Sequence, residues 1–145
     1  MKPLIVIGTV GSDVHSIANN LLEKALIDSG FQVENLGVAV PEIEWLDTIK
    51  NLQPDLAMIG SMNGDLIPLN HLIKSLTSLI SPWKIIVGGK LNLGSHGSSN
   101  APLLKAMGVR VIEDDEVSFE EIIEFCKKTL PSKEFLGHQL TRDAN

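Results

Sequence analysis

The sequence predicts an α/β fold: a flavodoxin-like (Rossmann-like), doubly wound sheet of five parallel strands in the order 2-1-3-4-5. Three observations lead to this prediction. Short β-branched runs alternate with longer segments of helical period, as in a parallel sheet covered on both faces. Several of the runs are unbroken apolar stretches, as expected for strands buried on both sides. The length of 145 residues suits a single domain.

Five apolar runs give the expected strands. These are Leu4–Ile7, Gln32–Leu36, Leu56–Ile59, Lys84–Val87 and Val109–Ile112. Sheets of this order bind ligands in the crevice beyond the carboxyl ends of their strands, where the strand order reverses. The segments 8–15, 60–65 and 88–98, which we expect to be loops after the first, third and fourth strands, are therefore the places to look for a site.

Two helices are expected in the first half of the chain. The first runs from Ser16 to Asp28 and ends at Gly30, a residue suited to a left-handed cap. Its apolar stripe consists of Ile17, Leu21, Leu22, Ala25 and Leu26. The second begins after Pro41, which suits the first helical position. Its apolar stripe consists of Trp45, Leu46, Ile49 and Leu52.

Three further helices follow in the second half. The third continues until Ser81-Pro82, and its stripe consists of Leu69, Leu72, Ile73, Leu76 and Leu79. The fourth spans about Ser99–Met107 and ends at Gly108. The fifth opens with a capping box of Ser118 and Glu121. Its buried stripe consists of Phe119, Ile122, Ile123, Cys126 and Leu130.

Composition excludes several classes of partner. Twelve Lys and Arg against eighteen Asp and Glu give a formal charge of minus 6, which repels nucleic acids and anionic lipid surfaces. The apolar run Leu4–Ile7 is far shorter than the roughly 20 residues needed to cross a bilayer. The single cysteine, Cys126, cannot form an internal disulfide and fits a reducing, cytoplasmic location. Residues 131–145 have little apolar content and are expected to form a tail, mobile or docked on a partner.

The segment after the first strand carries a carboxylate two residues before an imidazole, Asp13 and His15. It lacks the lysine of a phosphate loop and the glycine spacing of a dinucleotide site. A carboxylate in this position suits the second ring nitrogen of a metal-binding histidine. An N-cap at Ser12 or Asp13, with His15 as a first-turn surface residue, is the simpler explanation when these residues are considered alone. The other histidines are scattered in sequence, so the remaining ligands of a metal at His15 would have to come from a cofactor.

Small residues follow the third and fourth strands. Gly60, Ser61 and Met62 begin one segment, and Gly88-Gly89 begin the other. Glycines permit close approach of a bulky ligand, and they also permit ordinary turns. The conjunction of an imidazole with two glycine-lined clefts favours a long ligand between sheet and helices.

These residues resemble the signature of cobalamin-binding domains, D-x-H-x-x-G, S-x-L and G-G. The similarity spans about residues 3–130 and extends to the small, cobalamin-binding subunit of glutamate mutase, which the segments 11–15, 29–33 and 105–108 resemble. Three positions differ from the signature. They are Ala18 for its glycine, Gly60 for its serine and Met62 for its leucine.

The resemblance implies that residues 1–130 bind adenosylcobalamin, with His15 as the lower axial cobalt ligand and Asp13 hydrogen-bonded to it. The implied cofactor-binding set is Ser12, Asp13, Val14, His15, Ser16, Gly60, Ser61, Met62, Gly88, Gly89, Lys90, Leu91, Asn92, Leu93 and Gly94. A separate large barrel subunit, forming a heterotetramer with this one, would carry the substrate site of a carbon-skeleton mutase acting on glutamate or a similar acid. The alternatives are a cobalamin carrier or regulatory module without isomerase activity, and a corrinoid methyl-transfer protein. We expect a helical domain ahead of the sheet in the latter, whereas here Met1-Lys2-Pro3 leads directly into the first strand.

Overall fold

A computed structural model of the protein describes residues 2–10, 16–61, 66–89, 101–112 and 119–130. Ser118, expected to cap the fifth helix, and the expected tail 131–145 lie outside these ranges. Five parallel strands form one sheet in the order β2-β1-β3-β4-β5, so the predicted topology is confirmed. The strands are β1 (Leu4–Thr9), β2 (Gln32–Asn35), β3 (Leu56–Ser61), β4 (Ile85–Gly89) and β5 (Arg110–Ile112).

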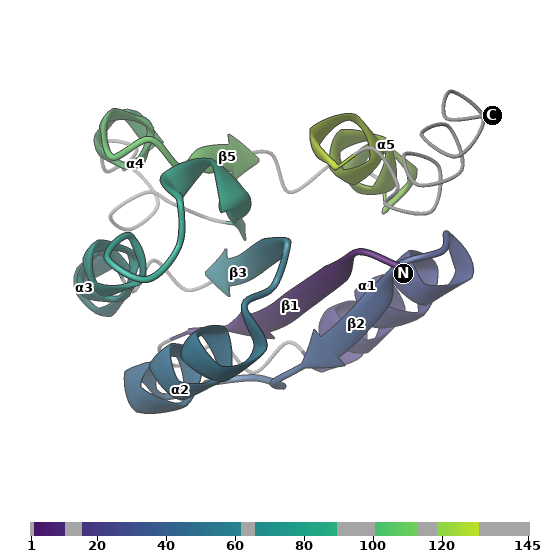
Figure 1. Ribbon diagram of the computed structural model, residues 1–145, viewed down its shortest axis with the longest axis horizontal. Helices are drawn as coiled ribbons and strands as arrows, with labels where there is room; N and C mark the ends of the chain where they lie inside the picture. The colour runs from purple at the N-terminus through teal and green to yellow at the C-terminus, as the bar shows by residue number, and fades with distance from the viewer. Residues whose placement is uncertain (1, 11–15, 62–65, 90–100, 113–118, 131–145) are drawn as a thin grey trace, which may run out of the picture.

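Helices cover both faces of the sheet. They are α1 (Ser16–Asp28), α2 (Glu42–Leu52), α3 (Leu66–Leu76), α4 (Ala101–Ala106) and α5 (Phe119–Thr129), with a short 3-10 helix η1 (Pro82–Lys84) before β4. Figure 1 shows α2, α3 and α4 on one side and α1 and α5 on the other. In the part of the chain that the structure describes, no helix is long and apolar enough to cross a membrane.

Two apolar clusters fill the space between sheet and helices. The first faces α2, α3 and α4, and its strand residues include Val6, Ala57, Ile59, Ile85 and Val87. The second faces α1 and α5, and its strand residues are Ile5, Ile7, Leu56, Met58 and Ile86. Successive residues of a strand point to opposite faces, so these two sets assign a face to every strand position.

The predicted helices are confirmed with three adjustments. Leu21 and Leu52 were expected on buried stripes but are 50% and 42% exposed. Leu21 lies about 140° around α1 from the buried Leu26, given 3.6 residues per turn. Leu52 is the last residue of α2. Helix α3 ends at Leu76 rather than at Ser81, and a turn continues through Ile80, whose amide donates to the Leu76 carbonyl (3.0 Å).

The main correction concerns the strand ends. Gly8, Gly60 and Gly88 were expected in loops, but β1, β3 and β4 continue through them. Gly60 and Gly88 pair with a strand on each side, and Gly8 pairs with Ile59 of β3. Gly88-Gly89 therefore form part of β4 and are not a turn. In the middle of a parallel sheet, pairing on both edges outweighs the weak strand preference of glycine.

Gly8 lies beneath the indole of Trp45, the largest fully buried side chain. A Cβ at position 8 would lie 2.9 Å from Cζ2 of Trp45, which is too close for two carbon atoms. The absence of a side chain at Gly8 therefore allows α2 to pack closely on the sheet.

We predict that Gly8→Ala lowers the free energy of unfolding by about 1–3 kcal/mol, because Trp45 has to move. Urea denaturation measures this loss. Gly88→Ala is the matched control in another inner strand, since its Cβ would make an ordinary contact, 3.5 Å from the Ile112 carbonyl oxygen. Equal losses for the two variants would contradict the prediction.

Candidate functional site

Four residues form a single row across the carboxyl ends of four strands. Thr9 pairs with Gly60, Gly60 with Gly88, and Gly88 with Ile112. All four have the strand parity of Ile7, Met58 and Ile86, so the row faces α1 and α5. We call these four residues the edge row.

The middle of the edge row has no side chains. A Cβ at Gly60 would lie 3.3 Å from Cγ2 of Thr9. At Gly88, the carbonyl oxygen of Ile112 is the one atom of the described residues within 4 Å of such a Cβ. The two glycines therefore leave a floor of bare backbone between Thr9 and Ile112, which a flat or bulky ligand group can approach closely.

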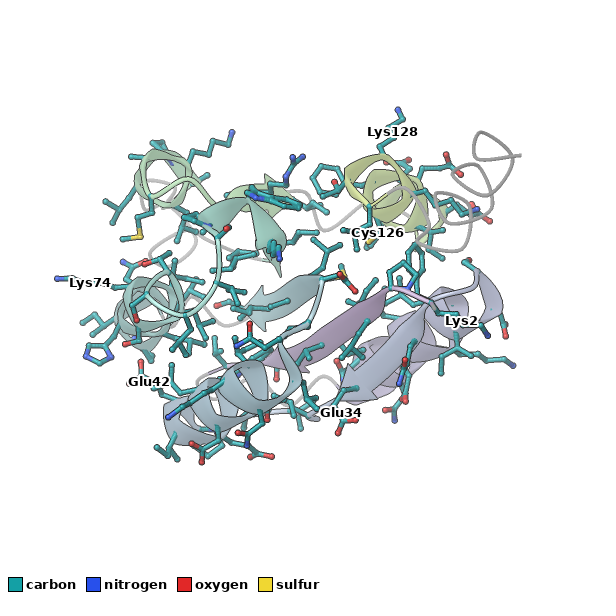
Figure 2. The ribbon with its side chains drawn as sticks, in the orientation of Figure 1. Lys2, Glu34, Glu42, Lys74, Cys126 and Lys128 are labelled. Carbon is teal, nitrogen blue, oxygen red and sulfur yellow. The ribbon has the colours of Figure 1, made fainter. Side chains whose placement is uncertain are left out.

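Helix α5 contacts the sheet one row below the glycine pair. Sγ of Cys126 lies 3.9 Å from Sδ of Met58, two residues before Gly60 in β3. Figure 2 shows Cys126 between α5 and the sheet, with Lys128 directed away from it. Burial raises the pKa of the Cys126 thiol to about 11, so it stays protonated at neutral pH and supplies no thiolate for a metal or a nucleophilic attack.

Ser61 belongs to the opposite face of the same edge. It shares the parity of Ala57 and Ile59, which face α2 and α3, and it pairs with Gly89. The Ser61 side chain is 1% exposed, and its Oγ has no hydrogen-bond partner among the described residues. A buried hydroxyl without a partner is costly, so Ser61 Oγ is available to a polar ligand atom.

Thr9 is held in place by the loop between β2 and α2. Its Oγ1 accepts a hydrogen bond from the amide of Ala39 (2.9 Å), and its carbonyl accepts one from Val40 (2.9 Å). The next amide, Val10, donates to the carbonyl of Gly60 (3.0 Å). The side chain that borders the glycine floor therefore has a fixed orientation.

The structure brings four of the expected binding residues together at this edge: Gly60, Ser61, Gly88 and Gly89. Ser16 is the first residue of α1. The remaining expected residues lie outside the described part of the chain. They are Ser12, Asp13, Val14, His15, Met62, Lys90, Leu91, Asn92, Leu93 and Gly94.

His71 belongs to a separate surface pair. Its Nδ1 lies 2.6 Å from Oε1 of Glu42, and the imidazole side chain is 71% exposed. His96 and His138 lie outside the described residues. Within the described ranges, no group of three His, Cys, Asp or Glu residues could hold a metal ion. A metal bound at this edge would need ligands from a cofactor or from residues beyond those ranges.

Sequence reasoning missed Thr9 and Ile112 as members of the edge. The register of a parallel sheet, which no spacing in the chain reveals, is what places them beside the glycines. The signal that could have found Thr9 is its position directly after the apolar run of β1, at the end where such sheets bind ligands.

The family model of the B12 binding domain matches residues 3–123. The glutamate mutase sigma subunit of Carboxydothermus hydrogenoformans is 30% identical over 129 residues, covering 87% of this chain and 94% of the relative. The glutamate mutase sigma subunit of Escherichia coli O157:H7 is also 30% identical, covering 99% of this chain and 98% of the relative.

Solved structures share the fold. A cobalamin-binding protein from Desulfitobacterium hafniense has a TM-score of 0.70 at 22% identity, covering 89% of this chain. This chain spans 60% of that protein's length. The signal receiver domain of a diguanylate cyclase from Desulfovibrio desulfuricans has a TM-score of 0.64 at 17% identity, covering 88% of this chain and 92% of that domain. At these identities the similarity establishes the fold alone.

We predict that substitutions at positions 60 and 9 are coupled in their effect on the free energy of unfolding. Gly60→Ala brings a methyl group against Cγ2 of Thr9, which cannot rotate away without losing its bond to Ala39. Thr9→Ser removes Cγ2 and keeps the hydroxyl. Gly60→Ala should therefore cost about 1 kcal/mol less in the Thr9→Ser background, as measured by a double-mutant cycle of urea denaturation. A coupling of zero would show that the two positions do not touch.

Proposed function

The chain belongs to the B12-binding domain family, and we propose that it is the cobalamin-binding subunit of an adenosylcobalamin-dependent carbon-skeleton mutase resembling glutamate mutase. The observation that carries this proposal is the glycine pair of the edge row, Gly60 and Gly88, which leaves bare backbone at the ligand-binding end of the sheet. The relatives named glutamate mutase sigma subunits, which match most of the chain, support the type of reaction.

The described residues fit a cobalamin. The floor at Gly60 and Gly88 accommodates a flat aromatic base on the side of α1 and α5, bordered by Thr9 and Ile112. The Oγ of Ser61, which lacks a hydrogen-bond partner within the described ranges, suits an amide substituent of the corrin. The bare floor on one face of the sheet and the buried hydroxyl on the other, both at the same edge, match a ligand with an aromatic tail and a polar periphery.

We assign His15 as the lower axial ligand of cobalt and Asp13 as the carboxylate that orients its imidazole. A carboxylate bonded to the second ring nitrogen fixes the tautomer of a metal-bound histidine and raises its basicity. Among the described residues, no group of three His, Cys, Asp or Glu offers an alternative metal site. The other proposed contacts come from Ser12, Val14, Ser16, Met62 and Lys90–Gly94.

The protein positions the cofactor, and a large barrel subunit that we place against the same edge supplies the substrate site. Bound adenosylcobalamin supplies a cobalt–carbon bond whose homolysis starts radical chemistry, here the conversion of glutamate or a related acid to a branched isomer. This subunit holds the tail of the cofactor at the glycine floor and supplies the cobalt ligand. We place the assembly, a heterotetramer, in the cytoplasm.

Titration of the protein with cobalamin tests the proposal. We expect an absorption spectrum in which histidine has replaced the cofactor's own base. His15→Ala should abolish that spectrum and weaken binding by at least about tenfold. The matched control is His71→Ala, which removes the exposed histidine paired with Glu42 and should titrate like the wild type.

Two results would count against the proposal. An unchanged spectrum of the wild-type protein at micromolar cobalamin, with a large mutase subunit present, would exclude cobalamin binding. Tight binding without turnover of glutamate or a related acid with any large subunit would favour the carrier alternative.

The variant Ser61→Ala separates the effect of the buried hydroxyl on stability from its effect on cobalamin binding. We predict that the free energy of unfolding of the unliganded protein rises by about 1 kcal/mol, because an unpartnered polar group is removed. Cobalamin affinity should fall by about fivefold, because a hydrogen bond to the ligand is lost. Ser75→Ala is the control, since its hydroxyl already donates to the His71 carbonyl (3.1 Å). A stabilised Ser61→Ala protein with unchanged affinity would remove Ser61 from the site.

A further inference from the structure

The side chain of Asn35, the last residue of β2, joins three segments of the chain. Its Oδ1 accepts a hydrogen bond from Nδ2 of Asn19 in α1 (2.6 Å) and another from the amide of Gly37 (2.8 Å). Its Nδ2 donates to Oε2 of Glu23, one helical turn beyond Asn19 (3.0 Å). Asn19 is 8% exposed, and Asn35 is partly buried.

The Gly37 end of this network continues to β1. The carbonyl of Gly37 accepts a hydrogen bond from the amide of Thr9 (3.1 Å). The same loop donates to Thr9 through the amides of Ala39 and Val40. Asn35 is therefore connected to the end of β1 through Gly37 and to the start of α1 through Asn19.

These two points lie on either side of residues 11–15, which carry Asp13 and His15. Thr9 and Val10 precede the segment, and α1 begins directly after it at Ser16. The chain enters this segment from Val10 and leaves it at Ser16, so the placement of the first turns of α1 relative to Thr9 sets where its two ends lie.

From this geometry we propose that Asn35 is a positioning residue that fixes both ends of the segment carrying His15 and so sets the cobalt ligand. Asn35 acts through its hydrogen bonds with Asn19 and Gly37 and does not contact the cofactor. The inference rests on the proposed role of His15.

The bonding pattern requires an amide at position 35. Asn35 accepts from Asn19 and Gly37 while donating to the Glu23 carboxylate. An aspartate keeps the two accepting interactions but turns a carboxylate oxygen toward the carboxylate of Glu23. Asn35→Asp therefore replaces the donating amide nitrogen with an accepting oxygen and hardly changes the shape of the side chain.

Glu23→Gln provides the rescue. In the double variant Asn35→Asp/Glu23→Gln, the glutamine amide donates to the aspartate, so donor and acceptor are exchanged and the network is complete again. Glu23→Gln alone keeps an acceptor for Asn35 and should behave like the wild type. Leu104→Ala, in the fully buried part of α4 on the other face, controls for a general loss of stability.

The test measures the full-length protein in two ways. Amide hydrogen exchange of α1 residues 20–23 in the unliganded protein reports whether the start of α1 is held, with the amides of α3 as an internal reference. Cobalamin titration reports the affinity and the fraction with histidine bound to cobalt. We expect Asn35→Asp to speed exchange and to weaken cobalamin binding, each by about tenfold or more, with the double variant within about threefold of the wild type.

Wild-type affinity and histidine-bound spectrum in Asn35→Asp would overturn the inference, whatever the exchange shows. Failure of the double variant to recover, or an equal loss of affinity in Leu104→Ala, would also overturn it, because either result reduces Asn35 to a general contributor to stability. If the wild type itself does not bind cobalamin, the proposed function fails, and unchanged exchange in Asn35→Asp would separately refute the link from Asn35 to α1.

Discussion

The structure depends on a pairing without side chains: Gly60 of β3 faces Gly88 of β4 at the end of the sheet where ligands bind. Below this pair, Met58 and Ile86 fill the space under α1 and α5, and Cys126 rests on Met58. At the pair itself, bare backbone forms the floor. The filled core at Met58 and Ile86 gives way to the open floor two residues later in each strand, at Gly60 and Gly88.

The two faces of the sheet differ in how closely side chains cover the backbone at this edge. On the side of α2, the Trp45 indole covers Gly8 so closely that a methyl group would not fit. On the side of α1 and α5, Gly88 has open space among its described neighbours. Glycine therefore serves close helix packing on one face and leaves bare backbone on the other, which is why we propose the α1 and α5 side for the ligand.

The sequence was sufficient to predict the order of the strands and the bounds of α1, because alternating runs and a glycine cap are local signals. It was not sufficient for the strand ends, where Gly60 and Gly88 resemble turn residues until pairing with both neighbours is known. The network around Asn35 was also beyond prediction, since it joins residues 9, 19, 35 and 37 through tertiary contacts. The positions of His15 and Asp13 relative to the edge stay a prediction.

The side of the sheet that holds the ligand is measured most directly by an isotope-edited nuclear Overhauser experiment on the protein loaded with diamagnetic cobalamin. We expect contacts between the aromatic protons of the cofactor's displaced base and the methyl groups of Thr9 and Ile112, which border the glycine floor. Contacts to Ala57 or Val87 on the other face, or a base that remains bound to cobalt and contacts neither side of the sheet, would contradict it.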